Sequence, residues 1–323
     1  MPTTVYYASD RVLTGAPDQV ASYGADIQPP SVSTGLVYGT AFVSGIDIPN
    51  DQQGQIDSIQ DTQTGSFAPD PAGDLANPGR DLLVFIHGFD NSFEDGITRA
   101  AFNRDWFAAS GVTSADMAVI AFSWPSLGQI IGFPIPQSDY LRDQSMARSA
   151  GIHLMTFFAN LEAPLKAARA AGFRTFLLAH SMGNLALESA VENWFLHGNG
   201  DAHLFDLAVL AAGDCPYDTF GQPNLTRLSG LTDLADRVAI YYSGDDHVLQ
   251  LSYVVNLGVQ RLGQDGPRNR ADTAEFPPAQ FRMVDASGFQ DYDFDLMSSH
   301  QYYRLSPNCR ASIIANIAPG AWA

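Results

Sequence analysis

Lysine is nearly absent from this 323-residue chain, and basic residues of any kind are few. Lys166 is the only lysine among 17 basic residues, and the 35 acidic residues bring the net charge to −18. A field this negative argues against nucleic acids and anionic membrane surfaces as partners. No Gly-Lys pair occurs, which excludes a phosphate-binding loop of the P-loop type.

Cysteine and long apolar runs are also scarce. Cys215 and Cys309 are the only two cysteines and lie far apart, so neither a disulfide framework nor a zinc knuckle is indicated. No His-Glu-x-x-His motif occurs, and we expect no metal and no cofactor. No apolar run approaches the ~18 residues of a membrane span. Met1–Asp10 lacks the regions of a signal peptide, which favours a cytoplasmic location, although a chain whose leader had been removed would look the same.

What the sequence does contain, from Arg80 onward, is a regular alternation of strand and helix patterns. Ser92 and Asp95 form a capping-box pattern, and Pro164 should kink or split the second helix. The predicted helices cover residues 93–109, 146–165 and 184–197. The predicted strands, nearly all apolar, cover residues 81–87, 117–124, 173–180, 204–212, 237–243 and 280–285. This alternation predicts a doubly wound α/β fold, with a mostly parallel sheet covered by helices on both faces.

We interpret residues 1–323 as a single domain. Residues 1–79 contain N-terminal strands, followed over 47–79 by a long polar excursion that reads as a surface loop, and residues 80–323 form the catalytic core. The apolar, Gly- and Pro-containing segment 124–140 follows a strand. It is either a small lid that contributes an acyl pocket or a buried connection.

The sequence Ala179-His180-Ser181-Met182-Gly183-Asn184 ends one strand and begins the next helix. A serine flanked by small residues at such a turn is typical of a nucleophile elbow, which lifts the hydroxyl above the sheet. The alternative is an ordinary helix N-cap. We favour Ser181 as a nucleophile because of the strand–turn–helix context.

A second turn, His87-Gly88-Phe89-Asp90, directly follows an earlier apolar strand. Acyl-transfer hydrolases of this architecture use such a loop, together with the residue after the nucleophile, to stabilise an oxyanion. We therefore expect the backbone amides of Phe89 and Met182 to form an oxyanion hole. His87 is expected nearby in a structural role, although the loop could also be a plain strand-end turn.

A serine needs a base and an orienting acid, which in this fold follow it in chain order. His300 lies after the last strand and before a C-terminal helix, so it is the preferred base, with His247 as the alternative. The acid is sought in the adjacent pair Asp245-Asp246, or in Asp214 after the preceding strand. The run Asp291–Asp295 alternates acids with aromatics; we interpret it as a solvated strand, with a metal site as the alternative.

These stretches together resemble the α/β-hydrolases, and among them the bacterial hydrolase family of unknown function number nine hundred. The resemblance covers about residues 80–305 and is carried by VFIHGFDNSFEDGITRAA, AFSWPS, LLAHSMGN, YYSGDDHVLQLS and SSHQYY, with the opening YYASDR matching weakly. It favours Asp246 as the triad acid, with Asp214 as a neighbouring site residue. We expect His87, Trp124 and Asp245 as further neighbours of the site. It implies serine hydrolase chemistry and leaves the substrate undefined.

We therefore expect a serine hydrolase, an esterase or lipase-like enzyme, that uses Ser181, His300 and Asp246 on a small-molecule or lipid-like acyl ester. A thioesterase, amidase or acyltransferase could use the same residues, and a binding protein could keep the fold without the activity. The sequence does not define the oligomeric state.

Overall fold

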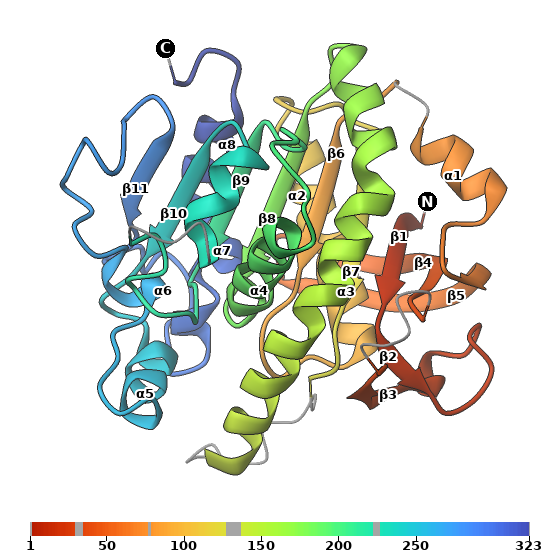
Figure 1. The fold of residues 1–323 in the computed structure, drawn as a ribbon, viewed down its shortest axis with the longest axis horizontal. Coiled ribbons are helices and arrows are strands. Elements are labelled where there is room, and N and C mark those ends of the chain that lie inside the picture. The colour runs from red at the N-terminus through yellow and green to blue at the C-terminus, as the bar shows by residue number, and fades with distance from the viewer. Residues whose placement is uncertain (1, 30–34, 77–78, 127–136, 222–226, 323) are drawn as a thin grey trace.

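The computed structural model describes residues 2–29, 35–76, 79–126, 137–221 and 227–322. Within these residues a nine-stranded sheet runs through the molecule in the order β11-β10-β9-β8-β6-β7-β1-β4-β5 (Figure 1). Its strands are β1 (Thr3–Ser9), β4 (Val37–Asp47), β5 (Gln52–Thr64), β6 (Leu82–Ile86), β7 (Ala118–Ser123), β8 (Thr175–His180), β9 (Leu207–Ala211), β10 (Val238–Tyr242) and β11 (Phe281–Asp285). A separate ribbon pairs β2 (Arg11–Leu13) with β3 (Tyr23–Ile27).

Seven strands of the large sheet run parallel, and β4 and β5 run antiparallel to their neighbours. The carboxyl ends of the parallel strands share one edge, which lies at the bottom of Figure 1. All six strands predicted after Arg80 are present. In β6, alternate side chains pack into the cores on opposite faces of the sheet, which explains why its sequence is apolar throughout.

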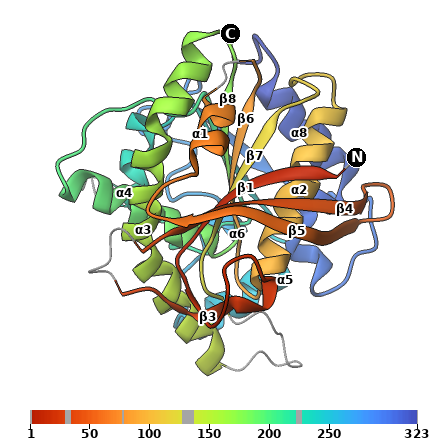
Figure 2. The same cartoon turned by 90° about the vertical axis from the view of Figure 1, so that its right-hand side faces the viewer.

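Helices cover both faces of this sheet (Figure 2). One core contains side chains of α3 (Gln137–Ala170) and α4 (Gly183–Leu196), and the other contains side chains of α2 (Phe93–Ala109) and α8 (Pro307–Ile317). The doubly wound α/β prediction is thus confirmed, as is the Ser92–Asp95 capping box. The short helices are α1 (Pro69–Leu75), α5 (His247–Val255), α6 (Leu262–Asp265), α7 (Tyr302–Leu305), η1 (Val20–Ser22), η2 (Arg227–Asp233) and η3 (Ser298–His300).

The prediction of a long loop over residues 47–79 is wrong. The segment contains the 13-residue strand β5, which pairs with β4 at the edge of the sheet, and then the helix α1. Most side chains of β5 are exposed, so polar residues suit both of its faces and no apolar alternation marks it. Ile59 is the one residue of this strand that is fully buried.

Of the two outcomes expected at Pro164, a kink or a split of the helix, the split is wrong, because α3 runs without a break for 34 residues. Buried Leu161 and Leu165 anchor the turns around the proline. No helix in the described part of the chain, α3 included, is both long enough and apolar enough to cross a membrane. Of the predicted lid segment 124–140, residues 127–136 lie outside the described residues.

Candidate active site

Ser181 occupies the tight turn between β8 and α4. Its backbone φ is +55°, a left-handed conformation that most side chains avoid. The turn is so close to the neighbouring loop that a Cβ on Gly183 would lie 2.5 Å from the carbonyl oxygen of His87. The N-cap of α4 is Met182, not Ser181, so the alternative of an ordinary serine cap is wrong.

Three side chains from separate loops meet at this turn. His300, the last residue of η3, places Nε2 2.7 Å from Ser181 Oγ. Its other ring nitrogen, Nδ1, lies 2.7 Å from Oδ2 of Asp246, which follows β10. All three residues are buried, with exposed fractions of 3% for Ser181, 5% for His300 and 0% for Asp246. The geometry allows a proton of the serine hydroxyl to pass to His300 while Asp246 orients the ring.

Asp246 is itself held in place by the helix that follows it. Its Oδ1 accepts a hydrogen bond from the amide of Leu249 at 2.9 Å and so caps α5. One carboxylate therefore performs both tasks, orienting the histidine and capping the helix. The adjacent Asp245 points elsewhere, because its Oδ2 accepts hydrogen bonds from the amide of Gly288 and the side chain of Gln290.

The other candidates lie outside this chain of hydrogen bonds. The ring of His247 packs edge-on against Phe294. Asp214 forms a separate buried cluster, in which it accepts hydrogen bonds from Tyr140, Ser252 and Arg261 at 2.6–2.8 Å. Its backbone amide donates to the carbonyl of Ser181 at 3.0 Å, so Asp214 supports the backbone of the turn rather than the histidine.

The loop after β6 lies directly against the serine. A Cβ on Gly88 would be 2.6 Å from the Cβ of Ser181, so glycine is required for this approach. Within the described residues, no acceptor is bonded to the backbone amides of Phe89 or Met182, the two amides expected to form the oxyanion hole. The loop and the elbow are thus brought together with two backbone donors left available.

His87 and Trp124 brace this loop. Their rings are stacked with centroids 5.2 Å apart, and the indole Nε1 donates to the carbonyl of His87 at 2.8 Å. Burial, reinforced by the charge of Arg11, lowers the pKa of His87 to about 3, which keeps the ring neutral. A neutral ring can donate from Nδ1 to the carbonyl of Gly88 and accept at Nε2 from the amide of Trp124.

His180 supports the base from the other side. Burial, followed by the nearby His300 ring, lowers the pKa of His180 well below its usual value, so this ring is also neutral. Its Nε2 lies 3.1 Å from the carbonyl oxygen of His300 and donates to it. His180, the residue before Ser181, therefore holds the backbone of His300, whose ring faces Ser181.

The run Asp291–Asp295 is not a strand, which corrects the sequence interpretation. Its carboxylates accept hydrogen bonds from the starts of helices: Asp291 from Ser306 and Asn308 at α8, and Asp295 from Met297 and Ser298 at η3. In the described parts of the chain, no group of three His, Cys, Asp or Glu side chains is arranged to hold a metal.

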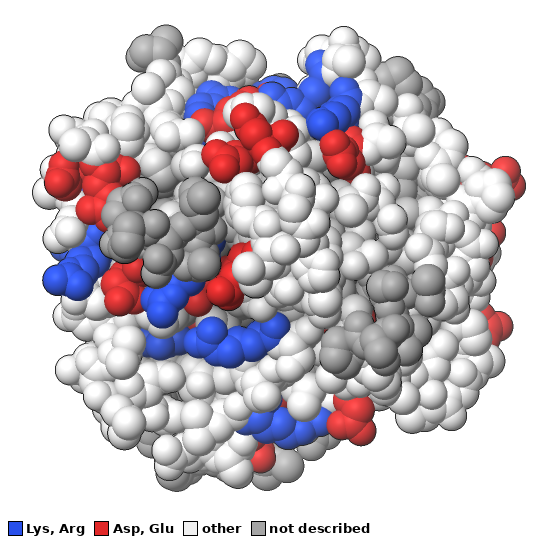
Figure 3. Space-filling view, in the orientation of Figure 1, with Lys and Arg blue, Asp and Glu red and all other residues white. Residues whose placement is uncertain are grey.

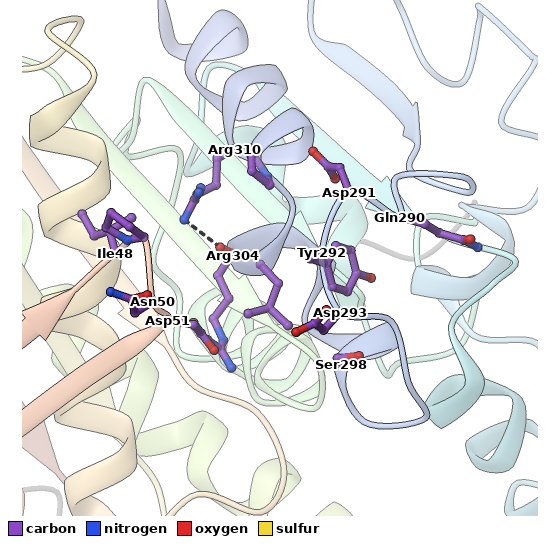
Figure 4. Close-up of a pocket in the computed structure, with 13 residues that line it drawn as sticks. Ile48, Asn50, Asp51, Gln290, Asp291, Tyr292, Asp293, Ser298, Arg304 and Arg310 are labelled. Atoms are coloured by element: carbon purple, nitrogen blue, oxygen red, sulfur yellow. Dashed lines mark hydrogen bonds and ion pairs between the residues drawn. The ribbon is translucent and has the colours of Figure 1, made fainter.

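A cavity of about 810 Å³ lies beside the site rather than at the serine (Figure 4). The β4–β5 turn forms one wall, and the loop around Tyr292 with helices α7 and α8 forms the others. Arg304 crosses it to pair with Asp51, and Arg310 donates to the carbonyl of Arg304. The pair ties the N-terminal hairpin to the helix that follows His300.

Sequence reasoning missed Arg11, Asn91 and Tyr140. Arg11 and Asn91 contact the loop after β6, and Tyr140 bonds to Asp214 with its ring 5.8 Å from that of Phe89. Arg11 and Tyr140 act across many intervening residues, whereas the side chain of Asn91 bonds to carbonyls two and three residues before it. Arg11 lies in the weakly matching opening YYASDR and Asn91 in the stretch VFIHGFDNSFEDGITRAA, but neither stretch indicated a role for them.

The sequence model of the family described as "Alpha/beta hydrolase of unknown function (DUF900)" matches residues 72–316. The chain belongs to this family. The match covers the end of α1, every strand of the core after β5 and the three loops that carry Ser181, Asp246 and His300. A comparison with curated proteins gave no match.

Solved structures of esterases are similar to this α/β hydrolase at low sequence identity. A thermostable carboxylesterase cloned from a metagenomic library shares 10% identity, with 90% of this chain and 85% of that chain covered and a TM-score of 0.37. The hyperthermophilic esterase of the archaeon Pyrobaculum calidifontis shares 10% identity, with 90% of this chain and 83% of that chain covered and a TM-score of 0.37. An esterase of the Planctomycetes species Thermogutta terrifontis shares 13% identity, with 92% of this chain and 95% of that chain covered and a TM-score of 0.34.

Proposed function

We propose that this α/β hydrolase is a serine esterase that works through an acyl-enzyme. The observation that carries the proposal is the continuous hydrogen-bonded chain Ser181–His300–Asp246, with 2.7 Å at both links. It ends at a serine on a strained turn, against which the Gly88 loop is packed. A serine, a base and an acid in this geometry activate a hydroxyl for attack on a carbonyl.

In the proposed reaction Ser181 Oγ attacks the ester carbonyl carbon while its proton moves to His300 Nε2. The negative charge on the carbonyl oxygen is stabilised by the amides of Phe89 and Met182. His300 then gives the proton to the leaving alcohol as the C–O bond breaks. Water, deprotonated by the same nitrogen, attacks the acyl-enzyme and releases the carboxylic acid and free Ser181.

The surface around the site favours an apolar acyl group. Six of the seven exposed large apolar side chains in the described residues lie on or just after α5, on the first turn of α3, or just before η3: Leu141, Tyr253, Val254, Leu257, Val259 and Met297. These elements also carry or adjoin Asp246, Tyr140 and His300. Residues 247–260 contain no Asp, Glu, Lys or Arg, and the surface over α5 is largely uncharged at the lower left of Figure 3. The start of α3 and α5 are in contact, and exposed apolar side chains on such neighbouring elements suit an apolar ligand.

The test is hydrolysis of p-nitrophenyl esters from acetate to palmitate by the wild type and by Ser181→Ala. We expect the variant to lose at least ~10³-fold in kcat/KM. Ser189→Ala is the matched control, because Ser189 lies on α4 and its hydroxyl donates only to the carbonyl of Arg148. The proposal is refuted if the wild type hydrolyses no ester and a fluorophosphonate leaves Ser181 unlabelled, or if Ser181→Ala retains wild-type turnover.

A further inference from the structure

Two side chains converge on one carbonyl of the loop that faces the serine. The oxygen of Gly88 accepts hydrogen bonds from His87 Nδ1 at 2.9 Å and from Asn91 Nδ2 at 3.0 Å. The Asn91 amide also donates to the next carbonyl, that of Phe89, at 2.7 Å. The side chain of Asn91 therefore holds the carbonyl oxygens of both peptide groups that flank the Phe89 Cα, those of Gly88 and of Phe89 itself.

Holding the Gly88 carbonyl sets the direction of an amide. The peptide unit between Gly88 and Phe89 is planar and trans, so its C=O and its N–H point in opposite directions. Donors that fix the carbonyl oxygen on one side consequently fix the Phe89 N–H on the other. Gly88 lies against the Cβ of Ser181, and it is on this side that an oxyanion donor is needed.

Asn91 is fully enclosed and is held from both ends of its own backbone. Only 1% of the residue is exposed. Its carbonyl accepts from Arg11 Nη2 at 2.8 Å, and its amide donates to Ser126 Oγ at 3.2 Å. The Ser126 hydroxyl in turn donates to Asp143 on α3 at 2.7 Å. The backbone of Asn91 is therefore held in place, and this limits the positions that its side-chain amide can adopt.

Burial of Arg11 has a high cost in solvation free energy, and the hydrogen bonds of its guanidinium show what structural role it has. It is 2% exposed, and within the described residues its hydrogen bonds go to neutral oxygens of Gly24, Asn91, Ser123 and Ser126. Burial lowers its pKa to about 10, which reflects the unfavourable transfer of the guanidinium from water. The fork of donors on its guanidinium joins the β2–β3 ribbon to the loops after β6 and β7.

We propose that Asn91 is the positioning residue of the oxyanion hole, with Arg11 as its anchor. Asn91 touches neither Ser181 nor the substrate; it acts through the Gly88–Phe89 peptide, whose N–H it aims at the developing oxyanion. The proposal rests on the esterase function proposed above. Asn91 lies within the stretch VFIHGFDNSFEDGITRAA, but the sequence by itself assigns it no role.

The variants Asn91→Ala and Asn91→Leu test this, the second because it keeps about the same volume and has no hydrogen-bond donor. Loss of one oxyanion donor lowers kcat by about 10²–10³, and a misplaced donor retains part of its effect, so we expect kcat to fall by about 10- to 100-fold. KM should change by less than about threefold, because the donor acts mainly in the transition state. The pH profile of kcat/KM should keep its wild-type midpoint, because the hydrogen bonds of His300 are untouched.

Asn160→Ala is the control, because the amide of Asn160 also donates to two oxygens, those of Tyr38 and Gly65, away from the elbow. It should behave as the wild type. The inference is overturned if either folded Asn91 variant, judged by circular dichroism, keeps wild-type kcat, or if its defect lies in KM or in a shifted pH midpoint. Should both Asn91 variants fail to fold, Arg11→Lys, which keeps the charge and loses the fork, decides by the same criteria. A wild type without turnover would instead refute the esterase proposal.

Discussion

The buried ring of His87 makes the stability of this protein depend on pH in a way that can be worked out from its surroundings. The residue is 1% exposed, stacks on Trp124 and has its pKa lowered to about 3 by burial and by Arg11. In the unfolded chain its pKa is about 6.5. Between these two values the unfolded state carries a proton on His87 that the folded state lacks.

The sign and size follow from this difference in bound protons. Because the unfolded state binds more protons, the contribution of His87 to stability is complete above pH ~6.5 and is lost as the pH falls, at ~1.4 kcal/mol per pH unit below about pH 6. From pH 7.5 to pH 5 His87 alone should lower the free energy of unfolding by about 2 kcal/mol. His180, whose pKa is also lowered by burial, acts in the same direction.

The assay is urea unfolding followed by circular dichroism at pH 7.5, 6 and 5, for the wild type and His87→Gln. The variant is expected to be less stable at pH 7.5, because the stacked ring is lost, but to lose about 2 kcal/mol less than the wild type on going to pH 5. His197→Gln, at the exposed end of α4, is the matched control for removal of one histidine. Parallel curves for wild type and His87→Gln would refute the reasoning.

Three further predictions concern the site. Asp246→Asn should lower kcat by about 10⁴ and Asp245→Asn should leave it unchanged, since only Asp246 faces the base; equal losses for p-nitrophenyl acetate would contradict this. Gly88→Ala places a Cβ 2.6 Å from that of Ser181, so kcat should fall by ~10² and stability by about 1–3 kcal/mol; wild-type kcat and melting temperature would place the loop away from the serine. Leu257→Ser replaces an apolar side chain that is 94% exposed. If this surface docks a long acyl chain, KM should rise for the palmitate ester and not for the acetate ester. An unchanged ratio of the two KM values would argue against an apolar docking surface.

The parts of the fold and site that sequence reasoning found are those encoded by consecutive residues. Strands β6 to β11 have short apolar runs, and α2 has its capping box, so local pattern identifies them. The turn at Ser181 is equally local. The strand β5 was missed because an edge strand needs few apolar residues, and α3 remained whole through Pro164 because packing against the sheet outweighs one missing hydrogen bond.

The parts that could not be predicted depend on contacts across the chain. Three carboxylates, Asp214, Asp245 and Asp246, lie at the same sheet edge, and only the folded positions show which one faces His300. The role of Asn91 depends on bonds from its side chain to backbone carbonyls and on Arg11, 80 residues earlier. Side-chain to backbone contacts of this kind have no residue-type signature in a single sequence.

The place of β1 inside the sheet makes one of its two pairings a contact between distant parts of the chain. It is the first strand of the chain, yet it pairs with β7. Val5 therefore lies opposite Val119, a residue far away in the sequence. The hydrogen bond between Ser181 and His300 spans 119 residues, whereas the turn that holds Ser181 is made of neighbours. Contacts between distant residues form late, because closing a long loop has a high entropic cost. The turn that carries Ser181 is thus a local structure, whereas its contacts with His300 and with the Arg11-anchored loop depend on residues far away in the chain, so the proposed site is complete only when the whole sheet has formed.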